Sequence, residues 1–308
     1  MRLLAFVLAF LLALTGCSGL PPQKAPVRAA GVPGFPITVT DARGRTLTLS
    51  APPQRIVSLA PSNTELLFDL GLGERIVGVT TACDYPPEAK QKPQIGGAYN
   101  LSVERVLGPG PDLVVAFGSI NQKPIAQLER ASVPVLTLDA RTVSEVYEAI
   151  RLLGRATGTA ARAEAIVQRM QQRMAAIETT VRDARPKPGV LIVYSVNPIY
   201  TTGPGSFIDE LVRIAGGVNV VTESLPQNIV TPERGVSLAP DVILCDPELV
   251  SRLKQIPGWS VLPAIRNNRF FHVSPRATLV RPTPRLVDGV EELARYLHPE
   301  RFRSSQSR

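Results

Sequence analysis

Apolar residues follow a helical period along the stretch from Thr159 to about Arg182. They recur three and four positions apart, which places one apolar stripe along a helix. No glycine or proline interrupts the stretch, and residues 186–189 mark its end. At about 1.5 Å per residue the helix is roughly 36 Å long, enough to span two packed domains. The stripe consists of Ala163, Ile166, Val167, Met170, Met174, Ile177 and Val181. We predict a rigid helix that joins two lobes.

Short apolar strands alternate with amphipathic helices on the N-terminal side of this helix. One helix begins at Ser62-Asn63-Thr64-Glu65, a sequence typical of a capping box in which Ser62 caps the helix and Glu65 reaches back. Alternation of this kind is typical of βα units and a mostly parallel sheet. The predicted strands are 55–59, 76–79, 113–117 and 135–138, after a hairpin of 37–40 and 46–49.

The C-terminal side repeats this organisation, with predicted strands at 190–194, 242–245 and 270–273 and a final helix at 284–297. Glu65 lies six residues before Gly71, and Glu210 lies six before Gly216. Glu104 lies eight residues before Asp112, and Glu233 lies eight before Asp241. Both spacings in the same order favour two lobes related by pseudo-two-fold symmetry. The alternative is that proline-aspartate before a buried strand is common loop chemistry.

The first residues are typical of a secretory signal. Arg2 precedes an apolar run at 3–14, which is too short to span a bilayer core of about 30 Å. The run ends in Leu14-Thr15-Gly16-Cys17, which resembles the bacterial lipoprotein signal, in which the cysteine is acylated. An ordinary secretory signal is the alternative. The predicted boundaries are a signal and lipobox at 1–17, a flexible tether at 18–35, an N-terminal lobe at 36–157, a linking helix at 158–185, a C-terminal lobe at 186–298 and a tail at 299–308.

The net charge of +8 does not indicate a nucleic-acid binder. Residues 1–35 and 301–308 each hold three basic residues and no acidic one, so six of the eight surplus charges lie at the ends. The remainder of the chain is nearly neutral and lacks a basic stripe. Of the cysteines outside the lipobox, Cys83 and Cys245 fall in different lobes, and we predict two separate, semi-buried thiols. The alternative is a disulfide, which would lock the lobes together.

The chain lacks the common catalytic motifs. It has no GxxxxGK[ST] loop, no GxGxxG after a strand and no GxSxG elbow. With only His272 and His298, it offers no histidine-based triad and no dedicated metal site. One enzymatic alternative remains, a cell-surface glycoside hydrolase that uses Glu104 and Glu233 as acid and base. Each of these glutamates opens a short helix, where a carboxylate also stabilises the helix dipole.

Two lobes without a catalytic set favour a protein that closes on a ligand. In open α/β sheets, ligands bind beyond the carboxyl ends of the strands. Those ends carry Cys83, Asp84 and Tyr85 in the first lobe, with Phe117, and carry Tyr194, Tyr200 and Cys245 in the second.

Several motifs resemble the periplasmic vitamin B12/iron-siderophore binding family. They are Val57 to Glu65, Cys83-Asp84-Tyr85-Pro86-Pro87, Pro111 to Val114, the Gly216-Gly217-Val218-Asn219 turn and Ser274-Pro275-Arg276. The resemblance covers roughly residues 53–297. It implies an α/β fold with two Rossmann-like lobes joined by a single long α-helix and a ligand cleft between them. It also implies a solute-binding component of an ABC importer, monomeric, without enzymatic activity or a cofactor of its own.

The resemblance assigns roles to particular residues. Glu104 and Glu233 match the positions that dock on the permease, where one carboxylate per lobe suits a symmetric permease dimer. The ligand is expected to be a cobalt corrinoid first, a ferric siderophore second and haem third. Two tryptophans that line the corrinoid pocket of the best-known member fall at Ala98 and Gln227. The expected ligand-binding residues are Cys83, Asp84, Tyr99, Phe117, Tyr194, Tyr200, Arg276 and Arg281, with Arg285 nearby, and Cys17 is expected to carry the lipid that anchors the protein outside the cytoplasm.

Overall fold

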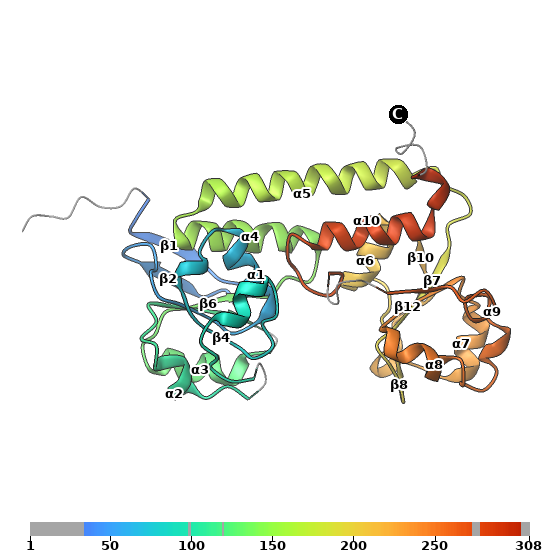
Figure 1. Ribbon diagram of the computed structural model, residues 1–308, viewed down its shortest axis with the longest axis horizontal. Helices are drawn as coiled ribbons and strands as arrows, with labels where there is room; N and C mark the ends of the chain where they lie inside the picture. The colour runs from blue at the N-terminus through green and yellow to red at the C-terminus, as the bar shows by residue number, and fades with distance from the viewer. Residues whose placement is uncertain (1–33, 98–99, 119, 273–277, 303–308) are drawn as a thin grey trace, which may run out of the picture.

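The computed structural model describes residues 34–97, 100–118, 120–272 and 278–302. Each lobe is built on a four-stranded parallel sheet, and the long helix runs above both lobes (Figure 1). Cys17, Tyr99 and Arg276 lie outside the described residues. Among the described helices, none has both the length and the apolar character needed to cross a membrane.

The N-terminal lobe follows the predicted alternation closely. A hairpin of β1 (Ile37–Thr40) and β2 (Thr46–Leu49) precedes a parallel sheet with the strand order β4-β3-β5-β6. The sheet strands are β3 (Ile56–Ser58), β4 (Ile76–Val79), β5 (Leu113–Phe117) and β6 (Val135–Leu138). The helices are α1 (Pro61–Asp69), α2 (Val103–Leu107), α3 (Gln122–Arg130) and α4 (Val143–Thr157), with short 3₁₀ turns at Gly73–Arg75 and Pro87–Gln91.

The C-terminal lobe repeats this topology, with the strand order β10-β7-β12-β13. In each parallel sheet the first strand along the chain, β3 or β7, is therefore internal and the fourth lies at an edge, in agreement with the predicted pseudo-symmetry. The strands are β7 (Gly189–Val193), β10 (Val218–Asn219), β12 (Val242–Cys245) and β13 (Phe270–Phe271). The helices are α6 (Phe207–Ile214), α7 (Pro232–Leu238), α8 (Val250–Leu253), α9 (Pro263–Arg266) and α10 (Leu286–Leu297).

A small antiparallel sheet in the second lobe was not predicted. It consists of β8 (Ser195–Val196), β9 (Ile199–Tyr200) and β11 (Ile229–Val230), in the order β11-β9-β8. Each of these strands has only two residues, which is too short to produce a period-two pattern in the sequence.

The linking helix is α5 (Ala160–Val181), and its buried residues are the seven of the predicted stripe. The stripe is covered by helices from both lobes, because α5 packs on α4, α10 and α6 (Figure 1). The largest apolar core runs without a break from the first lobe through α4, α5 and α10 into the second. The single linking helix is therefore confirmed, but it is part of a packed helical layer.

The capping box predicted at Ser62 and Glu65 is wrong. The N-cap of α1 lies two residues earlier than predicted, at Ala60, whose methyl side chain cannot accept a hydrogen bond, and the helix begins at Pro61. Proline favours the first helical position, because its fixed φ fits the helix and its missing N–H would have no partner there. Glu65 is consequently free of a capping role, and its carboxylate bonds to residues of the other end of the chain.

Candidate functional site between the lobes

Glu104 and Glu233 occupy equivalent positions in the two lobes. Glu104 lies in the first turn of α2, whose N-cap Ser102 accepts a hydrogen bond from the backbone N–H of Arg105. Glu233 lies in the first turn of α7, whose N-cap Thr231 accepts one from the backbone N–H of Arg234. Both helices lie away from α5 (Figure 1). The two lobes thus present one glutamate each from the same local structure.

Both of these carboxylates face solvent. Glu104 and Glu233 are exposed, and within the described part of the chain neither belongs to an ion pair. The Ser102 hydroxyl donates a hydrogen bond to Glu104 Oε2 at 2.6 Å, and this bond lowers the pKa of Glu104. A charged carboxylate at a helix N-terminus is stabilised by the helix dipole. Glu104 is therefore a solvent-facing carboxylate whose anionic form is stabilised within its own helix.

The loop after β4 places one predicted residue inside the lobe and one at the lobe boundary. Cys83 is buried, and its sulfur lies 3.1 Å from Thr64 Oγ1 and 3.2 Å from Thr80 Oγ1. Asp84, the next residue, is exposed and turns toward the other lobe. Cys83 therefore fixes the base of the loop, while Asp84 points outward. Cys83 and Cys245 are both free, as predicted, and both are buried rather than semi-buried.

Two of the predicted ligand-binding residues, Asp84 and Arg281, come together across the lobe boundary. Arg281 Nη1 lies 2.6 Å from Asp84 Oδ1 and 2.7 Å from Glu65 Oε1. Arg285 donates to both oxygens of Glu65, at 2.9 Å each. Its guanidinium also stacks 3.6 Å from the centre of the Tyr85 ring. We call Glu65, Asp84, Arg281 and Arg285 the boundary cluster.

The charges of the boundary cluster balance. Two arginines meet two carboxylates, and the Glu65 side chain is only 1% exposed whereas that of Asp84 is 53% exposed. Burial alone would raise the pKa of Asp84, but the hydrogen bond and charge of Arg281 outweigh it and lower that pKa. Close by, burial and the charge of Glu65 raise the pKa of Asp69 to about 6. An ion pair this well shielded, with several hydrogen bonds, is costly to break on one side only.

The predicted aromatic residues lie at the carboxyl ends of the strands. Tyr194 follows β7 and its backbone N–H donates to the carbonyl of Tyr200 at 2.9 Å, so the two tyrosines are neighbours. They are 47% and 41% exposed. Phe117 is the last residue of β5 in the other lobe and is partly buried. Both lobes therefore present aromatic surface where ligands of open α/β sheets bind.

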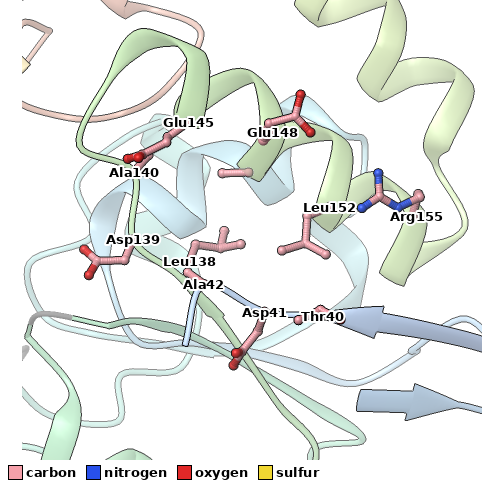
Figure 2. Close-up of a pocket in the computed structure, with 11 residues that line it drawn as sticks. Thr40, Asp41, Ala42, Leu138, Asp139, Ala140, Glu145, Glu148, Leu152 and Arg155 are labelled. Atoms are coloured by element: carbon pink, nitrogen blue, oxygen red, sulfur yellow. The ribbon is translucent and has the colours of Figure 1, made fainter. Parts of the chain in front are cut away.

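A separate hollow lies within the N-terminal lobe. It has a volume of about 340 Å³ and lies between β1, the end of β6 and α4. Figure 2 shows Asp139 and Arg155 on opposite sides of it, with Leu138 and Leu152 between them. Three of its four carboxylates are in ion pairs, Asp41 with Arg45, Asp139 with Arg141 and Glu148 with Arg151. The fourth, Glu145, accepts a hydrogen bond from the backbone N–H of Arg141. No group of three metal-ligating side chains occurs among the described residues. We assign no ligand to this hollow.

Comparison with known proteins places these features in a family. Residues 56–277 match the family described as periplasmic binding protein. The chain belongs to this family. An ABC transporter substrate-binding lipoprotein of Bacillus subtilis, YvrC, is 35% identical over 94% of each chain. A cobalamin-binding protein of Halobacterium salinarum is 30% identical over 95% of this chain and 83% of its own.

A solved structure agrees in fold. The periplasmic haem-binding protein RhuT of Roseiflexus sp. RS-1 superposes with a TM-score of 0.72 and 28% identity, over 80% of this chain and 99% of RhuT. A periplasmic binding protein holds solutes outside the cytoplasm and is not an enzyme, so the glycoside hydrolase alternative finds no support.

One residue of the boundary cluster, Glu65, was not predicted from the sequence as a site residue. The signal that could have found it is its repetition as Glu210 in the second lobe.

Proposed function

We propose that this periplasmic binding protein holds a corrinoid between its lobes, as a monomer, and delivers it to an ABC permease dimer. A lipid on Cys17 anchors it to a membrane on the extracytoplasmic side. The observation that carries the delivery role is the matched pair of exposed glutamates, Glu104 and Glu233, each in the first turn of an equivalent helix. A permease with two-fold symmetry offers the same surface to each lobe.

The docking glutamates act mainly on orientation and association rate. Exposed ion pairs contribute about 0–1 kcal/mol each, so two of them supply little affinity. Complementary charges instead steer encounter and fix the docking register. The expected partner surface carries one basic residue on each permease subunit.

The charge balance at the lobe boundary supports a ligand of low net charge. Arg281 and Arg285 are already matched by Glu65 and Asp84, so a polyanionic ferric tris-catecholate would have to displace a carboxylate from a guanidinium. A corrinoid presents a large ring and neutral amides, which suit Tyr194, Tyr200 and Phe117 as contact surfaces. The similarity to a cobalamin-binding protein points the same way. Ferric siderophores and then haem are the next candidates, the latter because of the similarity to RhuT.

Titration of the purified protein tests the ligand. Cyanocobalamin, a ferric hydroxamate, a ferric catecholate and haem are each titrated by isothermal calorimetry, with visible absorbance recorded in parallel. We expect saturable binding of cyanocobalamin at one site per chain, and weaker binding of the catecholate. Binding of haem or a ferric chelate in preference to cyanocobalamin would refute the corrinoid assignment.

A double variant tests docking separately. E104A/E233A should bind ligand as the unchanged protein does, while ligand uptake through the permease in proteoliposomes should fall at least tenfold. The matched control is E74A/E292A, which also removes one exposed glutamate from each lobe and should leave uptake unchanged. Normal uptake by E104A/E233A would exclude the docking role. Incorporation of labelled palmitate that is lost in C17S tests the lipid anchor.

A further inference from the structure

We propose that Glu65 and Glu210 are a matched pair of positioning residues that set the angle between the lobes. Each is rooted in the first helix of its own lobe. Each bonds across the lobe boundary to the start of the last helix of the other lobe. The proposal depends on the two-lobe fold and is independent of which ligand is bound.

The two glutamates are equivalent by topology. The helix α1 follows β3, and α6 follows β7, the first strand of each sheet. Glu65 and Glu210 each lie six residues before the glycine that ends their helix, Gly71 and Gly216. The elements that they reach are also equivalent, since α4 follows β6 and α10 follows β13, the fourth strand of each sheet. The contacts therefore obey the same pseudo-two-fold symmetry as the fold.

Glu65 holds the start of α10. Arg285 is the N-cap residue of that helix, and its Nε and Nη2 donate to Glu65 Oε2 and Oε1, each at 2.9 Å. Arg281, four residues earlier, donates to Glu65 Oε1 at 2.7 Å. The Glu65 side chain is almost completely buried. A paired guanidinium and carboxylate in a fork geometry fixes direction as well as distance.

Glu210 holds the start of α4. Its Oε2 accepts a hydrogen bond from the backbone N–H of Val143 at 2.9 Å. Val143 is the first residue of α4, so this N–H has no partner within the helix. A carboxylate at this point also interacts favourably with the positive end of the helix dipole. Glu210, a residue of the C-terminal lobe, thus accepts a hydrogen bond from the free N–H at the start of α4 in the N-terminal lobe.

The two contacts act on the same movement. Both α4 and α10 pack against α5, and Figure 1 shows them in a row between α5 and the sheets of the two lobes. Rotating one lobe against the other would move α1 away from the start of α10. The same rotation would move α6 away from the start of α4. Each contact therefore opposes the motion that breaks the other, and the pair defines one preferred angle.

Double electron–electron resonance on the full chain in detergent measures that angle. Spin labels are attached through genetically encoded p-acetylphenylalanine at Lys123 in α3 and Arg252 in α8, both exposed, so that the cysteines are left untouched. The unchanged protein should give one narrow distance distribution. E210A and E65Q should each broaden it and shift its mean by several ångströms, and the double variant should do so further.

Conservative variants separate positioning from general damage. E210Q should restore the narrow distribution, because an amide oxygen still accepts from Val143, whereas E65Q leaves Arg285 without a countercharge and Arg281 with Asp84 alone. E74Q, at an exposed glutamate of the same lobe as Glu65, is the matched control and should match the unchanged protein. If E65Q does not fold, E210A alone decides the matter, since it removes a single bond. A distribution for E210A that superimposes on that of the unchanged protein would overturn the proposal.

Discussion

The crossing of α4 and α5 offers a direct test of the packed helical layer. Gly154 in α4 is buried, and a Cβ added there would lie 2.4 Å from the Cβ of Ala163 in α5. Ordinary contacts between such atoms begin near 3.4 Å, so the two helices would have to separate by about 1 Å. The methyl group of Ala163 is attached directly to the backbone and cannot rotate away. G154A should therefore strain the crossing.

The magnitude follows from two opposing effects. Overpacking a core costs about 1–3 kcal/mol. Alanine in place of glycine within a helix returns about 1 kcal/mol. The free energy of unfolding of G154A should thus fall by about 0–2 kcal/mol. A163G should cost about 2 kcal/mol, from its lower helix propensity and the loss of one buried methyl group.

The double variant provides the decisive measurement. G154A/A163G moves the methyl from one helix to the other, so it should be close to the unchanged protein in stability. Urea unfolding followed by far-ultraviolet circular dichroism should give a coupling energy of about 2–4 kcal/mol between the two sites, the sum of the two single effects. Effects that add to within about 0.5 kcal/mol would refute the close crossing, because additivity is the behaviour of sites that do not touch.

Three further predictions concern individual residues. The pKa of Asp69 is raised from 3.8 to about 6, so the folded protein holds this proton more tightly than the unfolded chain, and the free energy of unfolding falls as pH rises from about 4 to 7. D69N should remove about 1 kcal/mol of that fall between pH 5 and pH 7.5, measured by urea unfolding, and an unchanged pH profile would contradict the reasoning. A Cβ at Gly235 would lie 2.4 Å from the Trp259 ring, so G235A should displace α7 and shift the tryptophan emission. Because α7 carries Glu233, G235A should also reduce uptake, and unaltered emission would count against the reasoning. Burial and the charge of Asp246 raise the pKa of Cys245 to about 12. Alkylation of Cys245 at pH 8, followed by mass spectrometry, should therefore be roughly 1000-fold slower than in the unfolded chain. Comparable rates in the folded and unfolded chains would be inconsistent with a buried thiol.

The sequence predicts the fold well where burial produces a pattern. The strands β4, β5, β6 and β12 have the predicted bounds, because continuous apolar runs between turn residues mark strands buried on both faces. The stripe of α5 is complete for the same reason. The prediction fails where one local residue changes the outcome, as at Pro61, which moves the start of α1 and removes the cap expected from Ser62.

The site is less predictable because its contacts join distant parts of the chain. Glu65 meets Arg281 across 216 residues and Arg285 across 220. No periodicity relates positions so far apart, and only the resemblance to a family placed Asp84 and Arg281 near one ligand. The internal repeat did carry a signal. Its spacing marked Glu65 and Glu210 as equivalent positions, although it did not show which residues they contact.

The two pairs of equivalent glutamates are linked through the angle between the lobes. In the proposed docking mode, a symmetric permease recognises the separation of Glu104 and Glu233. That separation depends on how the lobes are oriented, because α2 and α7 lie on different lobes, away from α5. The orientation is held by the continuous core of α4, α5 and α10 and, on our proposal, by Glu65 and Glu210. A change at the inner pair should therefore weaken docking without touching either docking residue, and uptake by E210A should fall while that by E210Q is retained.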